Sequence, residues 1–460
     1  MVLQRHPFVA TKKKSPVVRT LLFVAIFLLV SAGCAAALDP SHRISQYGHT
    51  AWRLQDGYFG SQPGPITQTI DGYIWVGTEG GVFRFDGVQF VPWTSLSGEQ
   101  LPSNVVIALF AARDGSLWIG TNEGLLQWGN GRSVRYLNIG SIGSILQDEN
   151  GVIWFSNDRT GDHTHPICRV NGTDVRCYSY DSAETAHLAA AVPLAKDRTG
   201  NFWVGHDTAV VQWRPGYTKV YRPAALKSNQ GINGVGGFAN AADGSVWVGF
   251  NTAGRGGGLQ QVVDGLMKPF VVPKLNGEAL EIWSLLIDRE GSLWVGTARQ
   301  GIYRIRGADV DHFGSVNGLS SDSVVGFYED REGNLWITTE KGLDMLRDPR
   351  VTTFSASEGL SEDDVFSVLA GRDGTVWIGS NHLQALIDGT VSPELGKGLP
   401  GSFVTSLLED HTGRLWVGMN NTLWIHEGGK TNGRFRQIIR RDGSPIGLVW
   451  GMAEDPEHNI

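Results

Sequence analysis

A single tryptophan-centred motif recurs nine times along the 460 residues of the chain. Successive motif tryptophans are 36 to 49 residues apart, with a mean spacing near 43. A fixed period of this length is the signature of a repeat architecture such as a solenoid or a propeller. The nine positions are Trp75, Trp118, Trp154, Trp203, Trp247, Trp294, Trp336, Trp377 and Trp416.

The residues around each tryptophan follow one frame. Glycine stands three positions before it in all nine copies, and Val or Ile stands directly after it in eight. Aspartate lies six positions before it in five copies and four before it in the other four. Aspartate bonds backbone N–H groups in tight turns, and glycine adopts the positive φ that such turns need. The frame therefore predicts a β-hairpin whose second strand carries the tryptophan.

Further strand-like segments flank each hairpin. An apolar segment precedes the turn, for example residues 105–110, and a glycine turn with a third strand follows it, for example residues 79–85. A looser fourth strand completes the unit. Four strands in about 43 residues are typical of a β-propeller blade. Helical repeats would show a 3.6-residue period and few turn glycines, and parallel β-helix repeats are shorter.

One ring is predicted to end after the seventh motif. An aromatic residue lies 23 positions before the motif tryptophan at Trp52, Phe313 and Phe354. Trp52 has no unit before it, so we predict that residues 45–55 supply the outer strand of the last blade and close the ring. We expect an all-β fold with a seven-bladed propeller over residues 41–352. Residues 353–460 would begin a second propeller of a longer protein; one open or nine-bladed ring is the alternative.

The first 37 residues have the pattern of a secretory signal peptide. A basic segment is followed by the apolar residues 21–30 and then by small residues up to Ala37. The apolar part is short for a membrane span. We expect cleavage near Ala37 and a periplasmic or otherwise extracytoplasmic protein. An uncleaved membrane anchor and lipidation at Cys34 are the alternatives.

The rest of the chain is acidic and keeps two cysteines. Without the leader, 34 basic residues stand against 46 acidic ones, a net charge of −12. This charge is a poor match for nucleic acid. A hairpin with its turn at residues 171–174 places Cys168 opposite Cys177, so we predict a disulfide in an oxidising compartment. Two unpaired thiols are the alternative.

Several units resemble the two-component regulator propeller repeat. The resemblance is carried by residues 318–325 (GLSSDSVV), residues 330–343 (DREGNLWITTEKGL) and residues 71–87 (DGYIWVGTEGGVFRFDG). It covers nearly everything from about residue 45 onward. In that family, paired propellers form the periplasmic sensor of a membrane histidine kinase or a related output protein, and known examples sense oligosaccharides. The resemblance implies a signalling protein of which this chain supplies only the detecting part.

Residues that depart from the frame, lie in the longest inserts or add aromatic rings are the candidate ligand contacts. They are His163, His165, His206, Trp213, Phe250, Arg255 and Trp283. One His-x-His pair is a weak metal signal, and the glycines around Arg255 have no following helix to bind phosphate. We therefore predict no metal, no cofactor and no catalytic residue.

These observations favour a non-enzymatic, ligand-sensing propeller region of a two-component signalling protein. The expected partner is an oligosaccharide or other small molecule, with no nucleic acid. Contact with a membrane would come only through a missing C-terminal helix or an uncleaved leader, and a homodimer stays open. The alternatives are a propeller enzyme, such as a lyase or a glycosidase, and a scaffold that binds proteins or polymers without signalling.

Overall fold

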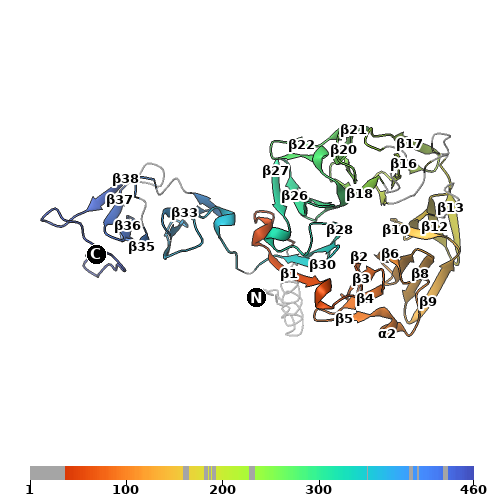
Figure 1. Ribbon diagram of the computed structural model, residues 1–460, viewed down its shortest axis with the longest axis horizontal. Coiled ribbons are helices and arrows are strands. Elements are labelled where there is room, and N and C mark those ends of the chain that lie inside the picture. Colours follow the sequence, from red (N-terminus) through yellow and green to blue (C-terminus); the bar gives the residue numbers. More distant parts are fainter. Residues whose placement is uncertain are drawn as a thin grey trace, which may run out of the picture.

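The computed structural model describes residues 37–158, 165–180, 185, 188, 193–226, 234–349, 351–392, 397–400, 403–427 and 434–460. Its strands form nine four-stranded antiparallel sheets and one two-stranded sheet. Figure 1 shows seven of the four-stranded sheets arranged radially in a ring, with the other two beside it. The predicted all-β propeller fold is confirmed. The predicted leader lies outside the described residues except for Ala37.

Each ring sheet is one repeat, written here from the ring centre outward. The first three sheets are β2 (Pro63–Gln68), β3 (Ile74–Thr78), β4 (Gly81–Phe85), β5 (Phe90–Pro92); β6 (Val106–Ala111), β7 (Leu117–Thr121), β8 (Gly124–Gly129), β9 (Arg132–Leu137); and β10 (Ser141–Gln147), β11 (Ile153–Asp158), β12 (Ile167–Asn171), β13 (Asp174–Tyr178). The next two are β14 (Leu194–Lys196), β15 (Phe202–Gly205), β16 (Val210–Arg214), β17 (Tyr217–Tyr221); and β18 (Val235–Asn240), β19 (Val246–Phe250), β20 (Leu259–Val263), β21 (Leu266–Pro269).

The sixth sheet is β24 (Ile282–Ile287), β25 (Leu293–Thr297), β26 (Ile302–Arg306) and β27 (Asp309–Phe313). The seventh is β28 (Val324–Glu329), β29 (Leu335–Thr339), β30 (Gly342–Arg347) and β1 (Gly48–Arg53). The two sheets beside the ring are β31 (Ser367–Ala370), β32 (Val376–Gly379), β33 (Leu383–Ile387), β34 (Thr390–Ser392); and β35 (Val404–Glu409), β36 (Leu415–Met419), β37 (Leu423–Glu427), β38 (Arg434–Ile438).

The remaining described elements are small. β22 (Val271–Val272) pairs with β23 (Leu275–Asn276). The helical segments are α2 (Trp93–Ser97) and the 3₁₀ turns η1 (Ile44–Gln46), η2 (Leu54–Asp56), η4 (Gly277–Ala279), η5 (Ser315–Asn317) and η6 (Ala356–Glu358). In the described part of the chain, no helix has both the length and the hydropathy needed to cross a bilayer.

The first strand closes the ring from the N-terminal side. β1 pairs antiparallel with β30, and Trp52 lies opposite Leu343 in this register. The inner strands contact one another in the order β2, β6, β10, β14, β18, β24 and β28, and β28 contacts β2. Among the described strands, the ring therefore closes after the seventh sheet, as the position of Trp52 predicts. The boundaries at 41–352 and 353–460 stay predictions.

The motif turns have the conformation that the sequence indicates. All nine motif glycines have a positive φ, between +82° and +96°. In the five copies with an aspartate six positions before the tryptophan, that carboxylate also accepts a hydrogen bond from the indole N–H at 2.7–2.9 Å. The aspartate therefore holds the turn and the core tryptophan together, which explains why both recur in one frame.

The glycine two positions after the motif tryptophan makes room for the next sheet. A Cβ on Gly77 would come within 2.6 Å of Val106 in β6, and one on Gly249 within 2.4 Å of Ile282 in β24. Contacts this short do not occur for real side chains, so these positions accept glycine because the inner strands lie so close. The cores between the sheets are built mainly of the motif tryptophans and aliphatic side chains.

Arginines five positions before the motif tryptophan tie each repeat to the next. The guanidinium of Arg331 donates to the carbonyls of Thr69 and Ile70 at 2.7 and 2.9 Å, which joins the seventh sheet to the first. Four other arginines donate to the equivalent turn of the following repeat: Arg113, Arg198, Arg289 and Arg372. These contacts cross between repeats, so the turns form a continuous polar belt on one side of the array.

Candidate functional site

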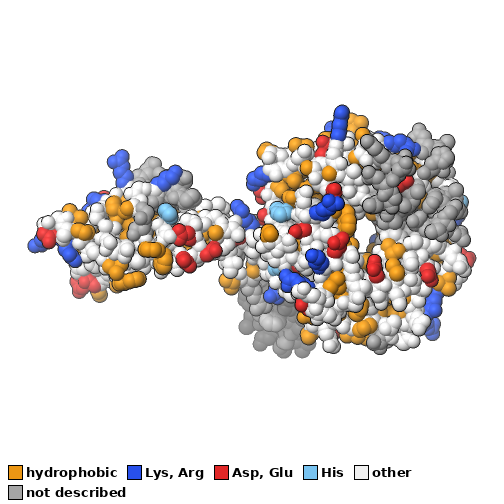
Figure 2. Space-filling view, in the orientation of Figure 1, with side chains coloured by type: hydrophobic (Ala, Val, Ile, Leu, Met, Phe, Trp, Pro, Cys, Tyr) orange, Lys and Arg blue, Asp and Glu red, His pale blue; other side chains and the backbone are white. Residues whose placement is uncertain are grey.

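A cavity of about 670 Å³ lies at one end of the ring, where the inner strands begin and the second strands end. Repeats four to seven contribute to it. Its lining consists of Asp207, Ala225, Leu226, Gly234, Asn251, Thr252, Ala253, Glu281, Trp283, Ala298, Arg299 and Glu340. A volume of this size is in the usual range for small-molecule sites. Figure 2 shows the ring hollowed near its centre, with acidic and basic side chains around the hollow.

Four of the lining residues occupy the same place in four successive repeats. Asp207, Asn251, Ala298 and Glu340 each stand four positions after the motif tryptophan, just beyond the end of the second strand. Because the repeats are arranged around one axis, one sequence position is carried to the same cavity by each of them. This position is the one through which the ring presents variable side chains to a ligand.

The other chemically active groups of the cavity come from the sixth repeat. Trp283, near the start of β24, is half-buried and offers an aromatic face. Arg299 forms an ion pair with Glu281 at 3.6 Å, and both side chains keep a large exposed fraction. Exposed ion pairs of this kind are weak, so a ligand can exchange them at little cost. With Asp207 and Glu340, the cavity holds three carboxylates against one guanidinium.

The predicted contacts at the preceding position point elsewhere. His206 is 1% exposed, and its Nε2 lies 2.8 Å from the hydroxyl of Tyr180. Burial raises the pKa of Tyr180, so the phenol keeps its proton and can donate to this nitrogen. Phe250 has no exposed surface and packs with Val235 and Val248 between the sheets. Adjacent residues alternate in direction along a strand, so a shift of one position separates the core from the cavity.

Trp213 and Arg255 are not part of the cavity lining either. Trp213 is 1% exposed and packs against Phe202 in the core. Arg255 is exposed in the loop after β19, and the neighbouring glycines serve the fold. The N–H of Gly256 donates to the carboxylate of Glu278 at 2.7 Å. This glycine-rich turn thus binds a carboxylate of the chain itself. Of the seven predicted contacts, the cavity lining includes Trp283 alone.

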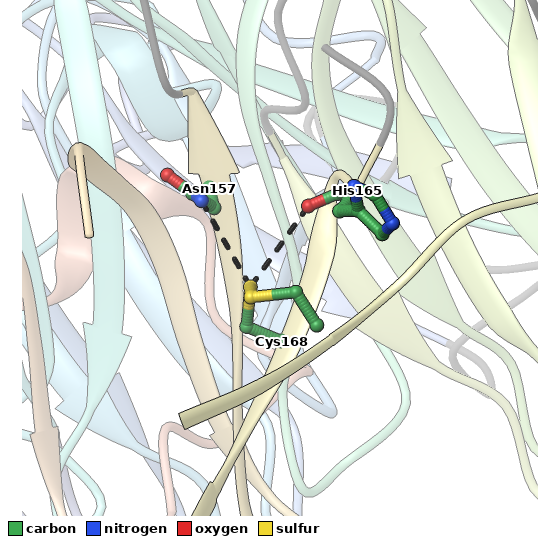
Figure 3. The surroundings of a disulfide bond; sticks show 4 residues. Asn157, His165 and Cys168 are labelled. Atoms are coloured by element: carbon green, nitrogen blue, oxygen red, sulfur yellow. Dashed lines mark hydrogen bonds between the residues drawn. A yellow bond between two sulfur atoms is a disulfide. The ribbon is translucent and has the colours of Figure 1, made fainter. Parts of the chain in front are cut away.

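The predicted disulfide lies in the third sheet, away from the cavity lining. Cys168 and Cys177 are bonded and stand opposite each other in the β12–β13 register. Figure 3 shows Asn157 and His165 beside Cys168, with the carbonyl oxygen of His165, not its imidazole, turned to the sulfur. The two approaches to the sulfur are 3.9 Å each. A disulfide sulfur carries no proton, so the second is a packing contact. His163 lies outside the described residues.

Ring, blade and cavity together define a β-propeller with a polar binding site at one end. Five segments match the two component regulator propeller model, at residues 100–123, 277–299, 318–341, 359–382 and 398–421. The chain carries the repeats of the two component regulator propeller family, as its motifs indicate. No curated protein matches the chain.

Solved structures similar to the chain are propellers of several kinds. The extracellular domain of a protein of B. thetaiotaomicron, described as a one component or hybrid two component system, matches with a TM-score of 0.51 and 18% identity over 86–88% of this chain. The chain spans 54% of that domain. PorZ, a surface component of the type-IX secretion system of Porphyromonas gingivalis, matches with a TM-score of 0.50 and 16% identity, over 80% of this chain and 57% of its own.

A lyase is among the similar structures. Inactive virginiamycin B lyase from Staphylococcus aureus, solved with quinupristin, matches with a TM-score of 0.51 and 15% identity. The match covers 66% of this chain and 99% of the lyase. At such identities, these likenesses show the fold alone.

Proposed function

We propose that the chain is the extracytoplasmic, ligand-sensing part of a two-component signalling protein, and that its cavity binds a neutral oligosaccharide. The observation that carries the proposal is the cavity itself, to which four successive repeats contribute the same sequence position. The family of the repeats and the extracellular domains with the same fold support the signalling context.

The chemistry of the lining favours a sugar. Carboxylate and amide oxygens from Asp207, Asn251 and Glu340 can accept hydrogen bonds from hydroxyl groups, and Trp283 can stack on the apolar face of a pyranose ring. Three carboxylates against one guanidinium disfavour an anionic ligand. We therefore expect neutral oligosaccharides to bind and uronate-containing ones to bind more weakly.

Sensing follows from the way the cavity is divided among repeats. A ligand that touches four sheets stabilises one arrangement of these sheets over others, in proportion to its differential affinity for them. The sixth and seventh repeats both line the cavity, and the seventh leads into the linker to β31. A change in packing at the cavity can thus be passed to the following sheets.

Calorimetric titration with a panel of neutral and acidic oligosaccharides tests the proposal. We expect at least one neutral oligosaccharide to bind, and Trp283→Ala to weaken it at least tenfold. Tyr217→Ala, an exposed aromatic residue of β17 outside the cavity lining, serves as the matched control and should bind as the wild type does. Absence of binding across the panel, or equal affinity of Trp283→Ala, would contradict the proposal.

The same incubations separate binding from catalysis. Mass spectrometry of the sugars after prolonged incubation should return them unchanged, because we propose a site that binds without turnover. Cleavage products that disappear with Glu340→Gln but persist with Glu79→Gln would favour the enzymatic alternative instead. Glu79 occupies the same repeat position as Glu340 but does not line the cavity.

A further inference from the structure

Two histidines replace the usual residues of the repeat at neighbouring turns near the end of the chain. His411 stands five positions before Trp416, where five other copies have an arginine. His458 belongs to a turn of the same kind, in which the N–H of Asn459 donates to the carboxylate of Asp455 at 2.8 Å. In that turn, His458 occupies the place that glycine has in all nine motifs.

The backbone at His458 adopts a conformation that suits glycine. Its φ is +66°, in the left-handed region, as in the nine glycine turns. A side chain with a Cβ is unfavourable there. The repeat itself offers glycine as the residue without this cost, so the imidazole is the feature that distinguishes this turn from the others.

The two imidazoles meet a common carboxylate. The rings of His411 and His458 are stacked, with their centroids 3.7 Å apart. Nδ1 of His458 lies 3.0 Å from Oε1 of Glu454, and Nδ1 of His411 contacts the same oxygen. The backbone N–H of His411 donates to the other carboxylate oxygen at 2.8 Å, which fixes the orientation of Glu454.

We infer that His411, Glu454 and His458 form a binding site for a divalent transition-metal ion, with Zn²⁺ as the preferred metal. One ligand atom from each residue lies within 4.8 Å of the other two, and among the described residues no other group of three reaches this spacing. Two imidazoles and one carboxylate are an established zinc ligand set that leaves a position open for water. Imidazole ligands also select against Mg²⁺ and Ca²⁺.

The burial of the three groups fits such a site. The carboxylate of Glu454 is mostly covered, whereas the side chains of His411 and His458 are 42% and 56% exposed. The covered carboxylate is held in place by the chain, and the exposed imidazoles can turn toward an ion that enters from solvent. The metal would link the turn of the ninth motif to the turn that follows β38.

Titration of the metal-free protein with ZnCl₂ tests this inference. The protein carries no histidine tag and is dialysed after treatment with a chelator. We expect one equivalent of Zn²⁺ to bind, and His458→Gly to weaken it at least tenfold, since loss of a group that only supports a ligand already costs 10–100-fold. His458→Gly restores the residue of the repeat, so its thermal midpoint without metal should equal or exceed that of the wild type.

Two further variants complete the design. His411→Arg, which restores the arginine of the other repeats, should weaken binding to a similar degree. His382→Asn removes an exposed imidazole of the eighth repeat and should leave the affinity unchanged. The inference is overturned if the wild type shows no saturable binding. It is equally overturned if the one-equivalent affinity survives both His458→Gly and His411→Arg.

Discussion

The indole of Trp52 is stacked on that of Trp336, with ring centroids 5.5 Å apart and an angle of 13° between the planes. Trp336 is the motif residue of the seventh repeat, and Trp52 precedes the first. Trp52 also makes edge contacts with Phe85 and Phe90 of the first sheet. One residue from the start of the folded region therefore lies between the last sheet of the ring and the first.

Removal of this indole should loosen the closure of the ring. Trp52 is half-buried, so we expect Trp52→Ala to lower the free energy of unfolding by about 2–4 kcal/mol, somewhat less than for a fully buried tryptophan. Denaturant titration measures the change. Trp450→Ala removes an indole that is 73% exposed and should cost less than about 0.5 kcal/mol. Equal effects of the two variants would contradict this role of Trp52.

The arginine contacts between repeats allow a test of local coupling. Arg331→Met removes the donors to the carbonyls of Thr69 and Ile70, at a cost of about 0.5–1.5 kcal/mol for such hydrogen bonds. Hydrogen exchange should become faster in β1 and β2 and stay unchanged in β35. Arg372→Met removes the equivalent contact to His411 and should have the opposite pattern. A uniform change in both variants would show that the contacts are not local.

The turn aspartates give the fold a defined dependence on pH. Burial raises the pKa of Asp197, but hydrogen bonds from Asn201, Trp203 and Thr199 outweigh this, so its pKa lies below the ordinary value. A carboxylate whose pKa is lower in the folded state stabilises the fold fully above the unfolded value of about 4, and this contribution is lost as the pH falls through the folded value.

Replacement of this carboxylate should reveal the effect. Asp197→Asn should lower the free energy of unfolding by about 1–2 kcal/mol at pH 7, and the difference from the wild type should narrow below pH 4. Asp264→Asn, at an exposed hairpin turn, is the matched control and should follow the wild type at every pH. A difference for Asp197→Asn that is constant from pH 7 to pH 3 would argue against this assignment.

The bond between Cys168 and Cys177 should stabilise the third sheet. It closes a short loop, for which the chain-entropy model gives about 2–3 kcal/mol. The thermal midpoint of the wild type should fall in the presence of a reductant. The double variant Cys168→Ser/Cys177→Ser should have the lower midpoint from the start and no response to the reductant. A wild-type midpoint that is insensitive to full reduction would contradict the prediction.

Local features of the fold could be predicted from the sequence. Each hairpin is encoded by its own aspartate, glycine and tryptophan, and the opposition of Cys168 and Cys177 follows from the length of one turn. The closing strand was also accessible, because Trp52 repeats the place of an aromatic residue found in later units. These features depend on short segments or on one repeated position, so the frame alone reveals them.

The site was harder to predict, because it depends on direction and on contacts between repeats. His206 and Phe250 deviate from the frame at the last residue of the second strand or just after it, but their side chains turn into the core. The next position, with Asp207, Asn251 and Glu340, lines the cavity. The signal was present in the sequence: the residue four after the tryptophan is Asp, Glu or Asn in six of the first seven copies.

Contacts across repeats left no trace that a single unit could show. The arginines before the motif donate to the following turn, and only the packing of successive sheets brings these groups together. The same holds for His411 and Glu454, which belong to consecutive turns. Once the structure gives the order of the sheets, the deviations at His411 and His458 become neighbours in space.

The most direct test of the account is a crystal structure of the chain with the tightest-binding neutral oligosaccharide. We predict electron density for the sugar in the cavity between repeats four and seven, with a ring stacked on Trp283 and hydroxyl groups within hydrogen-bond distance of Asp207 or Glu340. Density for the sugar on another surface, with this cavity filled only by solvent, would contradict the central claim.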